Sequence, residues 1–599
     1  MKLSKLYSNR PNMFEPINFA SGLNVVLGEI RLPENRNKDT HNLGKTTLGR
    51  LIDFCFLERA HKELFLLKHY NIFNEFVFFL EIKLIDGSYI TVRRSIENPA
   101  KISFKKHILG NQNFSSMPDL DWDHFDMPFK RARKMLDGLL DLRALKPWSY
   151  RSEIGYLLRS QGDFSDVFQL RKFAGPHSTW KPFLAHILGF NGDLLTSYYE
   201  KEDKVNENKV IEQTIVKELG GDSIEDISKI EGILLLKQQD AEDKQKLLDN
   251  FDFAVQDKEK TENLVNDIDG RIATLNADRY SLNYNHKKIV ASLKEDQILF
   301  NSDEAKRLFY EAGVLFEGQI KKDFDQLIAF NKAITSERRS YLEEERIDIE
   351  TKLKKVDEEL YTLGKQRSNI LGFLGDTDVF NKYKRVSMEM VMLRTNIASL
   401  ERQRDSLHRL QELRFNIRTL NDERSHIQTD IENDVKKQNT DKNSLFSSIR
   451  LFFNEIVEEV ISKKALLSVS LNGSGHLEFN ADILDESGNA TSAGLGHTYR
   501  KLLCIAFDLA VLRANLDVNF PRFVFHDGVF ESLDDRKKDN LLGVIRRYAS
   551  LGIQSIITLI DSDMPVRREK DGPLFDDGEI VLILHDENEQ GRLFKMRMW

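Results

Sequence analysis

The sequence predicts an α/β fold in which N- and C-terminal lobes assemble one head, with an inserted antiparallel α-helical coiled coil between them. Two observations predict it. Residues 1–195 and 446–599 alternate strand-like and helix-like segments. Residues 196–445 contain no proline and are rich in Glu, Lys, Arg, Leu and Ile, a composition typical of long solvated helices. We therefore expect three parts: 1–195, 196–445 and 446–599.

Composition narrows the class of protein. The 599 residues include 95 acidic and 87 basic side chains, for a net charge of −8, so any nucleic-acid contact must come from a local basic patch. The N-terminus lacks the apolar stretch of a signal peptide, and the run FVFFLEI is too short to cross a bilayer. We expect a cytoplasmic protein with no membrane contact. Cys55 and Cys504 lie in apolar surroundings and should be buried and unpaired.

In the first lobe, LNVVLGE (23–29) is a buried strand, and EFVFFLEIKL, YITV and ISFK predict further strands. Helical spacing of apolar residues predicts a helix over 45–57. In the last lobe, LLSVSL and HLEFNADIL predict a hairpin, and RFVFHDG and QSIITLI are buried strands on either side of a helix. The C-terminal GEIVLILHDENEQGRLFKMRMW predicts another hairpin.

The middle region repeats apolar residues at heptad spacing, for instance at Leu342, Ile349, Val356 and Leu363. Three stretches break the pattern: 220–226, 300–316 and 371–380. The second lies near the middle of the insertion, which places the expected turn-back near 300–318. The absence of a CxxC pair there excludes a zinc-clasped apex. An ordinary helical bundle is the alternative interpretation.

LGKTTL at 43–48 predicts a phosphate-binding loop of the Walker A type. Gly44 lets the backbone wrap a phosphate, Lys45 pairs with the β- and γ-oxygens of ATP, and the Thr46 hydroxyl binds Mg²⁺. Asn42 and Thr47 are expected to complete the loop.

The complete pattern GxxxxGK[ST] is not met, because Asp39 stands where the first glycine is expected. Gly28, at the end of the preceding strand, is expected to take that part, with residues 29–41 as an insertion.

RFVFHDG predicts a Walker B strand whose Asp527 holds Mg²⁺ through water. Seven residues later, Asp534 has the spacing of a D-loop that crosses a dimer interface. The alternative is a buried strand that ends in a turn aspartate.

TSAGLGHTYRKLLCIAFDLAVL (491–512) places a small-residue loop before an apolar helix. Ser492 and Gly494 can occupy the signature positions that touch the γ-phosphate of ATP on another subunit, although the segment alone is also an ordinary capped helix. Gln161 is a candidate Q-loop glutamine that contacts Mg²⁺ and the attacking water.

In this order, and with a coiled coil between them, the motifs resemble the SMC-like ABC ATPases of the double-strand-break-repair type. More narrowly, four segments resemble a subfamily found in bacterial three-component ABC and Lamassu-type anti-phage defence systems: SNRPNMFEPINFASGLNVVLGE, NLGKTTLGRLIDFCFL, LFYEAGVLFEGQIKKDFDQLIAFNKAITSERRSYL and HDGVFESLDDR. The resemblance implies ATP and Mg²⁺ as cofactors, head-to-head dimerisation on ATP, and sensing of double-stranded DNA along the coils. It also implies an effector subunit, often a nuclease, and a third small subunit.

Two positions depart from that pattern. The glutamate that usually follows the Walker B aspartate is replaced by Gly528, and Glu531 is a candidate catalytic residue that would have to reach back to the site. No histidine follows the last core strand, which offers Asp561 and Asp563 instead. We therefore expect slow ATP hydrolysis, with ATP acting mainly to hold two heads together.

Two basic clusters with aromatic neighbours are candidate DNA contacts, although they also suit a solvated face. Their residues are Arg93, Arg94, Lys105, Lys106, Lys130, Arg131, Arg133 and Lys134. The sequence thus favours an ATP-switched DNA sensor that controls an effector. A DNA-repair ATPase working with a nuclease at DNA ends, and a structural coiled-coil protein with degenerate nucleotide sites, remain alternatives.

Overall fold

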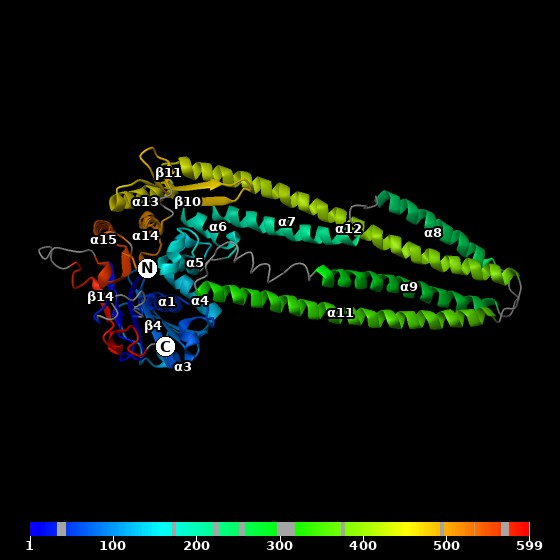
Figure 1. Ribbon diagram of the computed structural model, residues 1–599, viewed down its shortest axis with the longest axis horizontal. Coiled ribbons are helices and arrows are strands. Elements are labelled where there is room, and N and C mark those ends of the chain that lie inside the picture. Colours follow the sequence, from blue (N-terminus) through cyan, green and yellow to red (C-terminus); the bar gives the residue numbers. More distant parts are fainter. Residues whose placement is uncertain are drawn as a thin grey trace. The chain divides into compact units, whose positions relative to one another are not determined.

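The computed structural model describes residues 1–32, 43–170, 175–219, 227–250, 258–295, 318–372, 378–491, 496–531, 533–564 and 574–597. The chain forms two compact units, which are drawn in Figure 1: residues 1–204 with 420–599, and residues 205–419. The first unit is the α/β head built from both ends of the chain. The second unit is the inserted helical region. The predicted fold class is confirmed.

The core of the head is a parallel sheet that contains strands from both ends of the chain. Its order is β14 (Ile580–His585), β3 (Leu23–Glu29), β13 (Gln554–Ile560), β12 (Phe523–Asp527) and β8 (Leu158–Arg159). β12 is buried along its whole length and β3 along all but its last residue, as expected of a parallel sheet covered on both faces. Neither end of the chain can complete this sheet alone.

Two antiparallel sheets complete the head. One has the order β2 (Ile17–Asn18), β1 (Lys2–Ser8), β4 (Val77–Lys83), β5 (Tyr89–Ser95), β6 (Lys101–His107), β7 (His124–Pro128). The other holds β11 (Ala490–Thr491), β10 (Leu477–Leu484) and β9 (Ala465–Leu471), and its β9–β10 pair is the predicted hairpin. The predicted C-terminal hairpin is wrong. β14 pairs in parallel with β3, and residues 586–597 contain no strand.

The helices of the head are α1 (Lys45–Cys55), α2 (Phe65–Lys68), α3 (Tyr70–Phe73), α4 (Phe129–Leu140), α5 (Tyr150–Leu157), α6 (His177–Ile187), α13 (Leu445–Ile461), α14 (His497–Ala514) and α15 (Asp535–Ser550). α14 is buried on every side from Lys501 to Leu512, which makes it a central helix of the head. Cys55 and Cys504 are buried and free, as expected.

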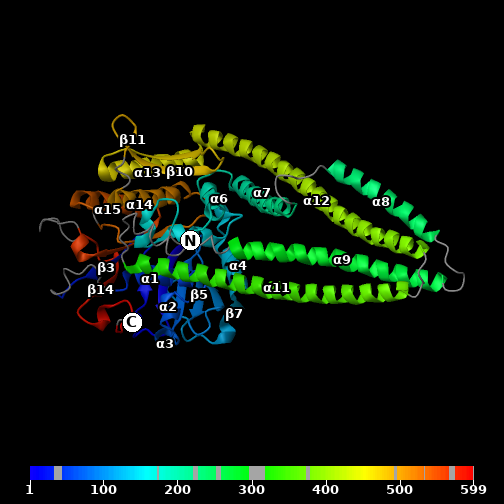
Figure 2. The same cartoon turned by 45° about the vertical axis from the view of Figure 1, so that its right-hand side comes forward.

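The inserted unit is built from long helices: α7 (Gly192–Glu218), which begins in the head, α8 (Ile227–Asp249), α9 (Lys258–Glu295), α11 (Gly318–Gly372) and α12 (Asp378–Thr440), which ends in the head. Figures 1 and 2 show α9 beside α11 and α8 beside α12. Ion pairs between arms run in antiparallel order, namely Glu212–Arg414, Lys244–Glu389, Asp269–Arg367, Arg279–Asp357 and His286–Glu350. The antiparallel arrangement is therefore confirmed.

Of the three predicted breaks, 220–226 and 300–316 lie outside the described residues, as do residues 373–377 of the third. Leu248, Val265, Tyr383 and Met390 form one buried cluster from three helices, α8, α9 and α12. The Arg402 guanidinium also donates to the Ala277 carbonyl at 3.0 Å, so the α9–α11 pair lies back against α12. The predicted turn-back near 300–318 falls on residues 300–317, which lie outside the described residues.

None of the described helices is long and apolar enough to cross a membrane.

A buried ion pair joins the two ends of the chain inside the head. Arg159, at the end of β8, donates to both carboxylate oxygens of Asp508 on α14, at 2.7 and 2.9 Å. Its remaining N–H groups donate to the carbonyls of Asp163, Asp166 and Val167, so all five guanidinium donors are used. Burial opposes the charged form, but Asp508 raises the pKa of Arg159 above its usual value.

Asp508→Asn should lower the free energy of unfolding of the head by about 3–5 kcal/mol, because it leaves Arg159 buried without a counter-charge. Denaturant unfolding followed by tryptophan fluorescence measures this change. All 4 tryptophans (Trp122, Trp148, Trp180 and Trp599) belong to the head unit, so the signal reports on the head alone.

The matched control is Asp141→Asn, which breaks an exposed ion pair with Arg143 and should leave the unfolding transition unchanged. A change for Asp508→Asn as small as that of the control would contradict the role of the buried pair.

Candidate functional site

The predicted phosphate-binding loop leads directly into α1. Gly44 is the N-cap of this helix and has a left-handed backbone, with φ of 99°. A Cβ at this position would lie 2.6 Å from Cβ of Leu593, so both conformation and space require glycine. The free N–H groups of the first turn of α1 and the positive end of its dipole form an anion site. Gly28 is the last residue but one of the neighbouring strand β3, and Thr47 is half-buried in the first turn.

Lys45 begins α1 and is surrounded by acidic groups. Burial lowers the pKa of its ammonium below the usual value. Four carboxylates are close enough to oppose that shift: those of Asp527, Glu531, Asp563 and Asp561. Residues from the loop, the Walker B strand and the segment after β13 therefore converge on this lysine.

Thr46 and Asp527 bring the two halves of the site together. The Thr46 hydroxyl donates to one carboxylate oxygen of Asp527 at 2.6 Å, across 481 positions of sequence. The other oxygen accepts from the Thr558 hydroxyl at 2.6 Å, which fixes the orientation of the carboxylate at the end of β12. Hydroxyl and carboxylate oxygens are the ligands that Mg²⁺ takes beside water and substrate phosphates. This donor pair fits Mg²⁺.

Glu531 lies over the residue that follows Asp527. One of its oxygens accepts from the Gln161 amide at 2.6 Å, and the other from the Lys501 ammonium at 2.8 Å. Lys501 also donates to the Gly528 carbonyl at 2.8 Å. The candidate Q-loop glutamine, the Walker B turn and α14 are thus joined through one carboxylate.

His526 faces away from this site, as strand alternation predicts. Its ring lies 3.0 Å from a carboxylate oxygen of Asp508, on the side of the sheet where Arg159 lies. On the other side, Asp561 accepts from the backbone N–H of Ile30 at 3.1 Å. Asp563 is partly buried, and burial followed by the nearby Glu531 raises the pKa of its carboxyl.

The structure describes only some of the remaining predicted binding residues. Asp534 caps α15 by accepting from the backbone N–H of Lys537 at 3.1 Å, and its side chain is more than half exposed. Its carboxylate also pairs with the Lys537 ammonium at 2.6 Å. Asn42, Ser492 and Gly494 lie outside the described residues.

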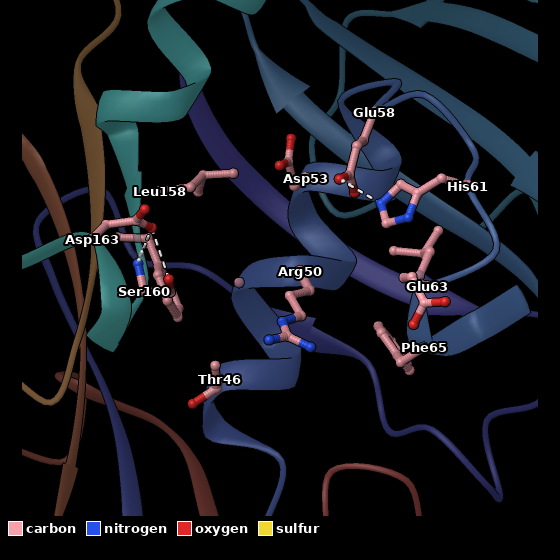
Figure 3. A pocket seen from close by; sticks show the side chains of 13 residues that line it. Thr46, Arg50, Asp53, Glu58, His61, Glu63, Phe65, Leu158, Ser160 and Asp163 are labelled. Carbon is pink, nitrogen blue, oxygen red and sulfur yellow. Dashed lines mark hydrogen bonds and ion pairs between the residues drawn. The ribbon is translucent and has the colours of Figure 1, made fainter. Parts of the chain in front are cut away.

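A cavity of about 350 Å³ opens beside the site along one face of α1. Figure 3 shows Thr46 at its lower end and Arg50 projecting into it, with Glu58 and His61 on the far side. Two of its carboxylates have partners: Asp53 pairs with Arg151 at 2.6 Å, and Asp163 accepts from the backbone and hydroxyl of Ser160. Through Thr46 this cavity adjoins the candidate site.

The basic clusters separate into three kinds of environment. The prediction that Arg94 contacts DNA is wrong. Its side chain is fully buried and donates to the carbonyls of Phe54, Glu58 and Pro99. Burial lowers its pKa to about 10, and its guanidinium cannot reach a DNA phosphate. Three other cations of β5 and β6 are paired with carboxylates: Arg93 with Asp126, Lys105 with Asp123 and Lys106 with Asp86.

The cluster on α4 is different. Lys130, Arg131 and Lys134 are exposed and Arg133 is half-buried. Among the described residues, none of the four makes an ion pair. The apolar face of α4, formed by Ala132, Leu136 and Leu140, is buried, so these cations project from the opposite face.

Sequence reasoning missed Lys501 and Thr558, which complete the site. Lys501 had a visible signal, because it is one of two charged residues, with Asp508, in the apolar segment of α14. A charge in such a segment is expected to have a partner. The identity of that partner, 30 positions away on the turn after β12, could not be read from the pattern.

Among families of known proteins, one matches the last part of the chain. Residues 456–598 match a family described as "Uncharacterised protein conserved in bacteria (DUF2326)". No curated protein matches the chain.

Among solved structures, the chain is similar to an Smc head domain with a coiled coil and joint from Pyrococcus yayanosii. The identity is 14% over 93% of this chain and 92% of that one, with a TM-score of 0.34. An Smc head domain with an extended coiled coil bound to the C-terminal domain of ScpA, from Pyrococcus furiosus, is 11% identical over 94% and 90%, with a TM-score of 0.31. An Smc head bound to the C-winged helix domain of ScpA is 10% identical over 94% and 91%, also at 0.31.

Glu153 on α5 is a buried acid beside the Arg159–Asp508 pair. It is 2% exposed, and one of its oxygens has no hydrogen-bond partner among the described residues. Burial, and then the charge of Asp508, raise the pKa of Glu153 well above its ordinary value of 4.5. The folded state therefore favours the protonated acid.

Glu153→Gln should stabilise the head at neutral pH, and the gain should grow as pH rises. Because the folded-state pKa is raised, the contribution of Glu153 to stability is complete below its unfolded pKa and is lost as pH rises toward the folded value. Unfolding of wild type and variant at about pH 5 and about pH 8 measures the difference. Exposed Glu97→Gln is the control. An equal gain at both pH values would contradict the raised pKa of Glu153.

Proposed function

We propose that this protein is an SMC-like ATP-binding DNA sensor that pairs its heads on ATP, clamps double-stranded DNA and controls an associated effector. The observation that carries the ATP-binding part is the contact between Thr46 and Asp527, beside Lys45 and the N-terminus of α1. Phosphate-binding backbone, a lysine cation and two oxygen ligands for Mg²⁺ meet there in the arrangement that a nucleoside triphosphate requires.

Each residue has a definite part in nucleotide binding. Gly44 and the first turn of α1 hold phosphate oxygens, and the Lys45 ammonium pairs with the β- and γ-phosphates. Thr46, Asp527 and Gln161 would hold Mg²⁺, which when bound neutralises phosphate charge. Lys45 alone is outnumbered by four carboxylates, so the metal is needed to admit further negative charge.

Head pairing is supported by one exposed residue and by the sequence pattern. Asp534 is exposed at the N-terminus of α15, and Ser492 and Gly494 match in sequence the positions that touch ATP of a second head. Slow hydrolysis follows from Gly528, since no carboxylate can be carried at that position. ATP would then act mainly as a bridge between two heads.

The proposed effector partner and the proposed role in defence rest on the resemblance of the four sequence segments quoted above. It supports an effector subunit, most often a nuclease, a third small subunit, and a role in bacterial anti-phage or anti-plasmid defence. Copurification of the chain with the products of its neighbouring genes, followed by a nuclease assay with and without DNA, tests this part. An effector that is active in the absence of DNA would favour a repair ATPase working with a constitutive nuclease.

Lys45→Ala should weaken ATP binding by about 10- to 100-fold, because it removes charge-assisted hydrogen bonds to the phosphates. Equilibrium binding of ATP measures the loss, and ATP-dependent dimerisation should disappear with it. Lys62→Ala, an exposed lysine in the loop after α1, is the control and should bind normally. A structural coiled-coil protein would lose nothing in either variant.

The exposed cations of α4 are the best-placed DNA contacts, because they are free of the carboxylate partners that hold Arg93, Lys105 and Lys106. Together Lys130, Arg131 and Lys134 offer a positive face on a chain whose net charge is −8. Phosphate contacts of this kind bind DNA without sequence preference and release counterions.

Reversing Lys130, Arg131 and Lys134 to Glu should weaken duplex binding at least about tenfold and reduce its dependence on salt. Each lost phosphate contact lowers the slope of log affinity against log salt by about 0.9. Fluorescence anisotropy across a salt series measures both quantities. The control reverses three exposed lysines elsewhere in the head unit: Lys436, Lys463 and Lys464. Equal losses in both triple variants would show that only total charge matters.

A further inference from the structure

The turn after Asp527 has no room for the glutamate that usually follows a Walker B aspartate. Gly528 has a left-handed backbone, with φ of 70°. A Cβ built on it would lie 2.4 Å from one carboxylate oxygen of Glu531 and 2.9 Å from the other. A side chain at 528 and the observed position of Glu531 exclude one another. The volume in which the usual glutamate would begin is filled by the carboxylate of Glu531.

Glu531 also lies within the nucleotide site. Its charge acts on Lys45 and on Asp563, which places the carboxylate near the phosphate end of the loop. It is joined to Gln161, the residue expected beside the attacking water. The side chain of Glu531 is 28% exposed, so water can reach it, whereas Lys501 behind it is only 3% exposed.

Both oxygens of Glu531 keep capacity for a water molecule. A carboxylate offers about four lone-pair sites, and the described residues use two of them, through Gln161 and Lys501. Each of these two donors binds a different oxygen of the carboxylate. The carboxylate is therefore oriented and accessible, as a general base requires.

We propose that Glu531 is the general base for ATP hydrolysis in this protein and takes the role of the glutamate that Gly528 replaces. This inference rests on the proposed ATP-binding function. The water oxygen forms a bond to the γ-phosphorus while the bond from that phosphorus to the β–γ bridging oxygen breaks, and its electron pair leaves with ADP. The proton lost by the water passes to Glu531 and from there to phosphate or solvent.

Lys501 and Gln161 are positioning residues in this scheme. Lys501 belongs to α14, whose preceding loop carries the candidate signature residues, and it holds Glu531 and the Gly528 carbonyl together. A movement of α14 on head pairing would therefore change the position of the base directly. Hydrolysis would be coupled to dimerisation through a single ion pair.

The test compares full-length wild type with Glu531→Gln, which keeps the size and hydrogen bonding of the side chain but cannot accept the proton. We expect ATP turnover to fall about 100-fold or more, while ATP affinity stays within about threefold. A second readout is the nucleotide retained by the ATP-induced dimer. Glu531→Gln should hold intact ATP in a long-lived dimer, whereas wild type should contain ADP.

Three further variants make the result specific. Glu531→Asp keeps a carboxylate and should hydrolyse faster than Glu531→Gln. Lys501→Met should lower kcat with little change in KM, because it disturbs the base and not ATP binding. Asp539→Asn removes an exposed carboxylate from α15 and should behave as wild type.

The proposal is overturned if Glu531→Gln hydrolyses ATP within about threefold of wild type, or if wild type binds ATP and dimerises but never hydrolyses it. Failure of wild type to bind ATP at all would instead refute the proposed function. Circular dichroism and the tryptophan unfolding transition confirm that each variant is folded.

Discussion

The head depends on a sheet that neither end of the chain can build alone, and the Arg159–Asp508 pair is the buried contact that locks its two contributions together. Strands β3 and β8 come from the first part of the chain, and β12, β13 and β14 from the last. A buried ion pair of this kind gives little net stability, because two charges must leave water. Its value here is specificity. Since all five donors of Arg159 are used, a shift of β8 relative to α14 would leave buried hydrogen-bonding groups without partners.

The arrangement that this ion pair fixes also positions the residues of the candidate site. Gln161 follows Arg159 by two residues, and Asp527 follows His526, which contacts the same Asp508. Fixing the side of the sheet that faces Asp508 thus also fixes the candidate site, where Thr46 meets Asp527 and Gln161 meets Glu531. Alternation along β12 places His526 and Asp527 next to each other in sequence but on opposite faces.

Most strands could be predicted because a covered parallel strand is a short, continuous apolar run, as in LNVVLGE and QSIITLI. Arg94 was mistaken for a surface cation, although the same alternation rule identifies it: it shares a face of β5 with Ile90 and Val92, which are both buried. The prediction of a C-terminal hairpin was wrong, because alternating hydrophobicity identifies a strand but not the strand with which it pairs. The Lys501–Glu531 contact joins residues 30 apart whose meeting depends on tertiary structure.

The charge balance of the site explains why so many acids can surround one lysine. Asp527, Glu531, Asp561 and Asp563 act on Lys45, and triphosphate adds further negative charge. At a separation of a few ångströms in partly buried surroundings, each like-charge contact costs on the order of several kcal/mol. Two features reduce that cost. Lys501 and Lys538 add positive charge near Asp563, and burial raises the pKa of its carboxyl above the ordinary value.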